Sequence, residues 1–121
     1  MEWNVYLSGE IHTNWREELK INCKTIKLPI EFTEPIIDHE LSDNCGPSIL
    51  GPETNKFWHD HKSAKLNSIK IKLAIEQSDI VIVRFGENYK QWNVAFEAGF
   101  ASALSKPLIV IHPPEYQHAL K

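Results

Sequence analysis

The sequence lacks several features that would assign it to a membrane or to a nucleic-acid partner. No apolar stretch approaches the roughly 18 residues that a membrane-spanning helix needs, and no basic segment precedes an apolar run and a cleavage site. The formal net charge of −3 is not the basic excess that nucleic acid and anionic membranes favour. We therefore expect a cytoplasmic protein that binds neither nucleic acid nor a membrane.

Few residues of the sequence are spaced as metal ligands. The two cysteines, Cys23 and Cys45, are too far apart for a CxxC metal motif, although a disulfide between them stays an open alternative. The triplet of His59, Asp60 and His61 lacks the rest of a ligand set. The sequence thus predicts no metal.

Common cofactor and nucleophile motifs are also missing. Gly9 follows the first apolar run, but there is no G-x-G-x-x-G fingerprint for a dinucleotide and no Walker A sequence for a nucleoside triphosphate. The absence of a G-x-S-x-G elbow weighs against a serine hydrolase. We therefore predict a protein without a cofactor.

Four short apolar runs are typical of strands. The composition, 42% hydrophobic and 24% charged, fits a single globular domain over residues 1–121. Strands are predicted at 3–8, 29–35, 79–85 and 107–113. The last two are uninterrupted apolar runs, which predicts strands that are buried on both faces.

Helical spacing of apolar residues occurs between these strands. It predicts helices over 14–26, 62–77 and 91–104. Asn14 and Glu17 have the spacing of a capping box at the start of the first helix. Strands that alternate with helices form a parallel sheet with right-handed crossovers, so the sequence predicts an α/β fold.

Two parts of the sequence fit this pattern less well. Residues 36–61 contain prolines, glycines and acids without a clear period, which predicts a long functional loop. The sequence stops soon after the fourth strand, where a doubly wound domain usually has another strand and helix. The sheet is therefore predicted to have four to five strands, in a domain that either is C-terminally shortened or ends there.

Glu97 is the leading candidate for chemistry. In an open parallel sheet, ligands bind outside the carboxyl ends of the strands, and Glu97 belongs to the helix that follows the third strand. If Asn93 caps that helix, Glu97 ends its first turn, where the helix dipole favours an ionised carboxylate. Such a group can attack an electrophilic carbon. The alternative is an ordinary surface acid near a helix start.

Several segments resemble one family. AFEAGFASALSKPLIVI resembles the E-x-G-x-A-x-A-x-x-K-P segment of nucleoside 2-deoxyribosyltransferases, VYLSGE their opening strand and loop, and SDIVIVRF their A-D-I-V-V strand. VYLSGEIHT, DHE, NKFW, DHK, VRFGE, YKQWN and HALK are similar to the bacterial YtoQ branch of that superfamily. The resemblance covers nearly the whole chain.

The resemblance implies a flavodoxin-like or Rossmann-like three-layer sandwich and cleavage of an N-glycosidic bond. Glu97 would be the nucleophile of a retaining double displacement, and Tyr6 would help to position it. The partner would be a small-molecule nucleoside or nucleotide, and relatives of this kind imply a homo-oligomer. We expect the substrate contacts to come from the loops at the carboxyl edge: Gly9, Glu10, Asp38, His39, Gln91, Trp92 and Asn93.

The sequence departs from the family at two acids. Gln91 and Ile71 stand where the family places aspartates, so the group that protonates the leaving base is open. Residues 38–43 supply substitutes in Asp38, His39, Glu40 and Asp43, unless this is simply a solvated acidic loop. Two other functions stay open: a non-catalytic nucleotide-binding module, which needs no acid, and, less favoured, a receiver-like signalling domain.

Overall fold

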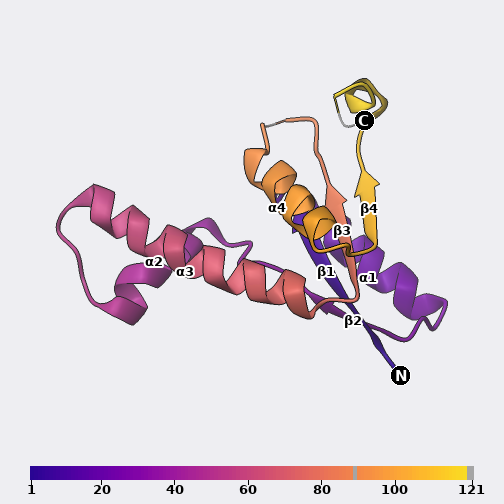
Figure 1. The fold of residues 1–121 in the computed structure, drawn as a ribbon, viewed down its shortest axis with the longest axis horizontal. Helices are drawn as coiled ribbons and strands as arrows, with labels where there is room; N and C mark the ends of the chain where they lie inside the picture. The colour runs from indigo at the N-terminus through magenta and orange to yellow at the C-terminus, as the bar shows by residue number, and fades with distance from the viewer. Residues whose placement is uncertain (89, 120–121) are drawn as a thin grey trace.

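A computed structural model describes residues 1–88 and 90–119 (Figure 1). Its four strands form one parallel sheet in the order β2-β1-β3-β4. This is the beginning of the flavodoxin-like strand order. The elements, in chain order, are β1 (Trp3–Gly9), α1 (Trp15–Thr25), β2 (Ile30–Thr33), α2 (His39–Leu50), α3 (Lys56–Gln77), β3 (Ile80–Arg84), α4 (Trp92–Ala103), β4 (Leu108–Ile111) and a 3-10 turn (Pro114–Tyr116).

The central strand β1 faces two layers of helices. Val5 and Leu7 are buried on one face, in a cluster with Trp15 of α1. Tyr6 is buried on the other face, against Ile75 of α3 and residues of α4. Successive side chains of a strand point to opposite faces, so β1 separates α1 from α3 and α4. The α/β three-layer fold is therefore confirmed, with four strands in the described part of the chain.

The fourth strand differs from its prediction. β4 was predicted to be buried on both faces, yet Ile109 is 49% exposed and its neighbours Val110 and Ile111 are each 39% exposed. β4 pairs only with β3 among the described strands and forms an edge of the sheet. An apolar run cannot distinguish a central strand from an edge strand when the side chains outside the edge are unknown. By contrast, β3 is buried as predicted.

The segment 36–61 is not the predicted long loop. It contains α2 and the first residues of α3, which starts six residues before its predicted start at Lys62. The helix signals were present: the side chain of Asp38 accepts from the amide of Leu41, and Gly51 ends α2 at a φ of 99°. Pro47 lies inside α2, and because a proline is not expected within a helix, the sequence pattern did not predict one here.

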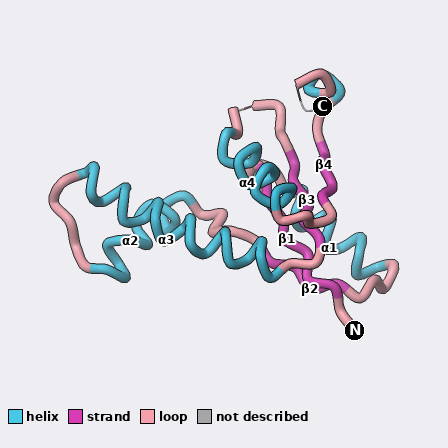
Figure 2. The backbone as a smooth tube through the Cα atoms, in the orientation of Figure 1, coloured by secondary structure: helices cyan, strands magenta, loops and turns pink. Residues whose placement is uncertain are grey.

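The α2–α3 hairpin is a helical arm that extends away from the sheet (Figures 1 and 2). Polar contacts hold its two helices together. The hydroxyl of Ser63 donates to the carbonyl oxygen of Asp43 at 2.6 Å, and the amide of Gly46 donates to the Ser63 hydroxyl at 3.0 Å. Asn67 donates to the Ser42 hydroxyl at 2.9 Å. Contacts between polar side chains and backbone therefore hold α2 against α3, and a search for apolar periodicity does not detect contacts of this kind.

The structure also tests the predicted capping box and the alternative of a disulfide. The first helix begins at Trp15 as predicted, but Asn14 makes no side-chain capping bond, so the predicted capping box is not formed. The two cysteines are free thiols rather than a disulfide. Within residues 1–88 and 90–119, no helix is long and apolar enough to cross a membrane.

Candidate functional site

A cavity of about 340 Å³ opens at the carboxyl ends of β1 and β2. This is the edge at which open parallel sheets bind ligands. β1 and the loop after it contribute Tyr6 and Gly9, and the end of β2 contributes Glu34. The remaining polar lining comes from the helices: His39 and Ser42 of α2, Asn67 and Lys70 of α3, and Asn93 and Glu97 of α4.

Glu97 is a buried carboxylic acid in the wall of this cavity. Only 5% of the residue is exposed. Its carboxylate accepts a hydrogen bond from the hydroxyl of Ser8, which lies on the same face of β1 as Tyr6. The N-cap of α4 is Gln91 rather than Asn93, so Glu97 lies in the second helical turn. The predicted dipole effect is weak there, and Ser8 holds the carboxylate instead.

Burial raises the pKa of Glu97 above its ordinary value. The hydrogen bond from Ser8 and the positive charge of Arg16 oppose this effect without cancelling it. A carboxylate that is poorly solvated but still held by one donor is a more reactive base and nucleophile than one in water. The alternative of an ordinary surface acid at this position is wrong.

Tyr6 lies in the same wall with its hydroxyl oxygen unpaired. The residue is fully buried, and its hydroxyl has no hydrogen-bond partner in the described part of the chain. Burial, reinforced by the negative charge of Glu97, raises the pKa of the phenol above its ordinary value. The phenol therefore stays protonated and can donate to a ligand or to Glu97. An unpaired buried hydroxyl costs about 1–3 kcal/mol, which a bound ligand would offset.

Arg16 anchors the loop that carries Gly9 and Glu10. Its guanidinium donates to the carbonyl oxygen of Glu10 at 2.8 Å and to that of Gly9 at 3.1 Å. Trp15 donates from its indole nitrogen to the same Glu10 carbonyl at 2.9 Å. These bonds use the start of α1 to fix the loop. Gly9 itself has no room for a side chain, since a Cβ there would lie 2.7 Å from the carbonyl oxygen of Arg84.

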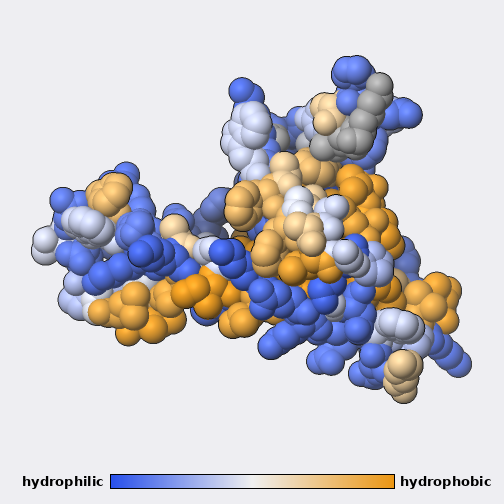
Figure 3. Space-filling view, viewed as in Figure 1, coloured by the Kyte–Doolittle hydropathy of each residue, from blue (hydrophilic) through white to orange (hydrophobic). Residues whose placement is uncertain are grey.

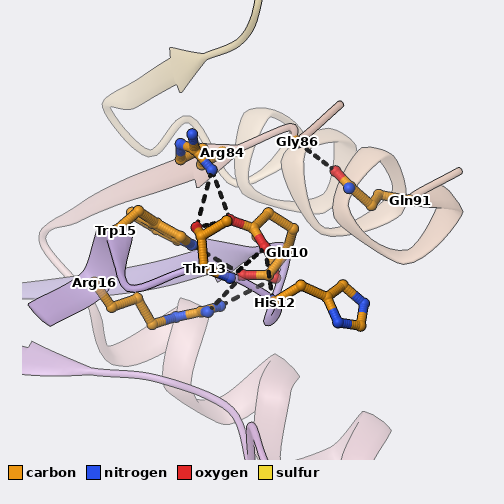
Figure 4. Close-up of polar contacts among 9 residues, drawn as sticks. Glu10, His12, Thr13, Trp15, Arg16, Arg84, Gly86 and Gln91 are labelled. Carbon is orange, nitrogen blue, oxygen red and sulfur yellow. Dashed lines mark hydrogen bonds and ion pairs between the residues drawn. The ribbon is translucent and has the colours of Figure 1, made fainter. Parts of the chain in front are cut away.

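The carboxylate of Glu10 is the centre of a second polar cluster, drawn in Figure 4. It accepts from the amides of His12 and Thr13 at 2.7 and 3.1 Å, from the hydroxyl of Thr13, and from Arg84 at 2.6 Å. Burial alone would raise the pKa of Glu10, but these hydrogen bonds and the Arg84 charge lower it below its ordinary value. Glu10 therefore holds the loop that follows β1 together and ties it to Arg84 at the end of β3.

The structure separates the predicted substrate contacts into two groups. Gly9, His39 and Asn93 line the Glu97 cavity together with Tyr6. Glu10 and Gln91 instead line a separate cavity of about 170 Å³. The side-chain oxygen of Gln91 accepts from the amide of Gly86 at 2.8 Å, which ties the β3–α4 loop (Figure 4).

Two further predicted contacts lie outside both cavities. Asp38 caps α2 through the amide of Leu41 at 3.0 Å. Trp92 is 74% exposed, and the ammonium group of Lys90 lies 5.9 Å from the centre of its ring. Neither side chain lines the Glu97 cavity as it stands.

Several residues of the site were not predicted. Ser8 could have been found from strand alternation, because it follows Tyr6 by two positions on β1. Glu34 follows β2 directly, but a single acid after a short strand carries no motif that marks it as part of a site. Asn67 and Lys70 lie on α3, and their position depends on the path of the arm, which the sequence did not reveal. Among the described residues, no group of three or more potential ligands could hold a metal ion.

A third cavity, an apolar groove of about 310 Å³, lies between α3 and α4. It shares Asn67, Ile71, Asn93 and Glu97 with the main cavity, so the two adjoin. Phe96 and Phe100 form much of its wall, and Phe96 is 71% exposed. The outer side of α4 therefore presents large apolar side chains to its surroundings.

Comparison with known proteins identifies the family. A model of the family described as nucleoside 2-deoxyribosyltransferase YtoQ matches residues 6–121. The chain belongs to the YtoQ family. This YtoQ-family chain is 47% identical to the uncharacterized protein YtoQ of Bacillus subtilis (strain 168) over 121 residues, which cover 100% of the chain and 82% of the relative. The matched span begins at Tyr6, the first residue of the cavity, and includes Glu97.

Proposed function

We propose that this YtoQ-family chain cleaves or transfers the N-glycosidic bond of a (deoxy)nucleoside or nucleotide, with Glu97 as the nucleophile. The single observation that carries the proposal is the state of Glu97: a buried acid in the wall of a cavity, with a raised pKa and one hydrogen-bond donor, Ser8. A carboxylate with a structural role is commonly paired with a cationic side chain, whereas the Glu97 carboxylate lines a cavity. The family description, which names a nucleoside 2-deoxyribosyltransferase, agrees with that chemistry.

The chemistry would be a double displacement. A carboxylate oxygen of Glu97 attacks the anomeric carbon, the bond from that carbon to the base breaks, and its electron pair leaves with the base. Water or a second base then attacks the same carbon from the opposite side and releases Glu97. The sugar carbon is thereby inverted twice, so the product retains the configuration of the substrate. Tyr6 would donate its unpaired hydroxyl proton as a hydrogen bond beside the reacting carboxylate.

A base-release assay tests the proposal. The purified chain would be incubated with a panel of nucleosides, 2′-deoxynucleosides and their 5′-monophosphates, and free base would be separated chromatographically. We expect release by wild type and a loss of at least about a thousandfold for Glu97→Gln. Glu115→Gln, an exposed acid outside the cavity, is the matched control. Absence of release from the whole panel, with folded protein, would refute the proposal.

A non-catalytic nucleotide-binding module is the second candidate. It is favoured by Ile71, which lines the cavity where the family resemblance places an acid. For such a module a nucleotide would raise the melting temperature and be recovered intact. Recovery of cleaved ligand from that melting experiment would decide for the enzyme.

We also propose that the chain acts as a homo-oligomer in the cytoplasm. Exposed apolar side chains support an oligomer, because patches of this kind on a globular chain commonly mark interfaces. Figure 3 shows apolar residues gathered on the arm and on the body. The exposed apolar side chains include Ile69 and Leu73 of α3 and Phe96 of α4, which are 55%, 49% and 71% exposed. Light scattering after size exclusion tests the oligomer. The free thiols of Cys23 and Cys45 suit a reducing compartment.

A further inference from the structure

The missing proton donor can be sought among the groups that share the cavity with Glu97. A purine or pyrimidine base departs poorly as an anion, so a glycosidic cleavage needs an acid near the leaving base. Five titratable side chains line the cavity in the described part of the chain: Tyr6, Glu34, His39, Lys70 and Glu97. Glu97 is committed as the nucleophile, which leaves four.

Three of the four are unsuitable. The pKa of Tyr6 is raised by burial and by Glu97, so its phenol gives up a proton less readily than an ordinary tyrosine. Glu34 accepts from the ammonium group of Lys20 at 3.1 Å and lies 3.8 Å from Arg16 Nε, contacts that a proton on its carboxyl group would disrupt. Lys70 carries an alkylammonium group, which as a class is a much weaker acid than an imidazolium.

We propose that His39 is the general acid that protonates the leaving base, a role that rests on the proposed function and deepens it. His39 is the first residue of α2 and lines the cavity with Glu97. An imidazole gains and loses a proton between about pH 5 and 8, so it can both donate and accept during turnover near neutrality. Asp38, the neighbouring acid, is occupied as the helix cap.

The surroundings of His39 contain groups of both signs. Its own helix contributes Glu40 beside it. The His12 ring of the β1–α1 loop lies 5.9 Å from the His39 ring, between centres. The other titratable groups that line the cavity with His39 are Tyr6 of β1, Glu34 after β2, Lys70 of α3 and Glu97 of α4. His12 lines the Glu10 cavity and not the Glu97 cavity, so it is not the donor itself.

The proton inventory of the reaction balances. Glu97 starts as a carboxylate and His39 as an imidazolium. When the bond between the anomeric carbon and the base nitrogen breaks, its electron pair goes to the base and the His39 proton is transferred to a basic atom of that base. The base leaves neutral, and the products are a glycosyl ester of Glu97 and a neutral imidazole. In the second step the imidazole takes a proton from the attacking water or base, which restores both groups.

A pair of substrates with different leaving groups tests this role. The base of 2′-deoxyguanosine needs an acid in order to leave, whereas the base of 7-methyl-2′-deoxyguanosine is already cationic below neutral pH, where both would be assayed, and leaves as a neutral molecule without an acid. The 5′-monophosphates of both would be run in parallel. We expect His39→Gln and His39→Asn to lower kcat/KM for the unmethylated substrate by about 10²–10⁴-fold and for the methylated substrate by less than about tenfold. His118→Gln, an exposed histidine outside the cavity, should change neither rate.

Activity on the methylated substrate also reports that the variants are folded with an intact nucleophile. For wild type, the rate on the unmethylated substrate should fall as rising pH removes the imidazolium, and this fall should be missing for His39→Gln, which has no imidazole at this position. Equal losses on both substrates, or no loss on either, overturn the role of His39 while Glu97→Gln still abolishes both reactions. If wild type releases base from none of the substrates, the proposed function fails, and the role of His39 fails with it.

Discussion

Ser8 donates a hydrogen bond to Glu97 across 89 positions of sequence, and it joins the carboxyl end of β1 to the second turn of α4. Both side chains are buried. The position of the Glu97 carboxylate is therefore fixed by the central strand of the sheet and not only by the helix that carries it. Five predictions follow from this geometry and from the contacts around it, beyond the assays described above.

Ser8→Ala should weaken catalysis while the cavity keeps its shape. Loss of the hydroxyl removes one of the two effects that lower the Glu97 pKa, so that pKa should rise further. A hydrogen bond to a charged group contributes about 1.5–3 kcal/mol, which corresponds to roughly a 10–150-fold loss in kcat/KM. The acid limb of the pH–rate profile should move to higher pH. Ser8→Thr keeps a donor and should behave like wild type; equal profiles for Ser8→Ala and wild type would contradict the role of this bond.

Glu97→Gln should make the protein more stable at neutral pH. The folded-state pKa of Glu97 is raised, so the folded state binds the proton more tightly than the unfolded chain does. The stabilisation from that proton is present below the unfolded value, about 4.3, and is lost as the pH rises through the folded value. The gain from Glu97→Gln should therefore be largest near pH 7–8 and shrink toward pH 4. Urea unfolding at both pH values measures it, and a variant less stable than wild type at pH 7.5 would be the wrong sign.

Tyr6→Phe should separate function from stability. The substitution removes a buried hydroxyl without a partner and leaves the ring, so the free energy of unfolding should not fall and should rise by up to about 1–3 kcal/mol. Base release should fall by about tenfold or more, because the donor beside Glu97 is gone. Tyr116→Phe is the control, since its hydroxyl donates to the carbonyl oxygen of Glu87 at 3.3 Å, outside the cavity. A large loss of stability in Tyr6→Phe would show that its hydroxyl has a structural partner.

Glu10→Gln should destabilise the fold with the opposite pH dependence. The folded-state pKa of Glu10 is lowered, so its stabilisation is present above the unfolded value and is lost as the pH falls through the folded value. We expect a loss of about 1–3 kcal/mol at pH 7 that diminishes toward pH 3, since Arg84 and the Thr13 hydroxyl lose a charged partner. Glu18→Gln, on the exposed side of α1, is the matched control. A loss that is independent of pH would mean that the charge of Glu10 is unimportant.

Gly46→Ala should disrupt the helical arm. A Cβ at Gly46 would lie 2.3 Å from the backbone nitrogen of Ser63 and 2.5 Å from the carbonyl carbon of Lys62, so α2 would have to move away from α3. We expect a loss of about 1–3 kcal/mol. Gly99→Ala is a matched helical control with nothing within 4 Å of the added carbon, and it should gain about 0.5–1 kcal/mol. Circular dichroism with urea measures both, and equal effects would contradict the close approach at Gly46.

Much of the sheet was predictable because its signals are local. β1 and β3 are apolar and buried, and each ends at a polar loop, so a short stretch of sequence defines them. The place of Glu97 at the carboxyl edge of the sheet was likewise predictable from the helix that follows β3, whereas its role stays a prediction. The edge position of β4 was not, because an edge is a property of the neighbours that a strand lacks.

The partners of Glu97 were harder to predict. The pairing with Ser8 depends on how α4 packs across the sheet, and the placement of His39 depends on α2, a helix that Pro47 and a polar interface concealed. Gln91 and Asp38 were predicted as ligand contacts, yet each makes a bond to the backbone of its own loop or helix. Amide and carboxylate side chains of this type bind backbone groups in turns and caps as readily as they bind ligands, so only a three-dimensional structure distinguishes the two roles.

The arm described above has a consequence for cooperativity. α2 packs chiefly against α3, through polar contacts, while the sheet is held by two apolar clusters to which α2 contributes no buried residue. A unit with few buried apolar contacts opens more easily than the core around it. We therefore expect the amides of α2 to exchange with deuterium through a sub-global opening that leaves β1 and β3 protected. His39, at the first residue of that unit, would then be positioned for chemistry by the least stable helix of the fold.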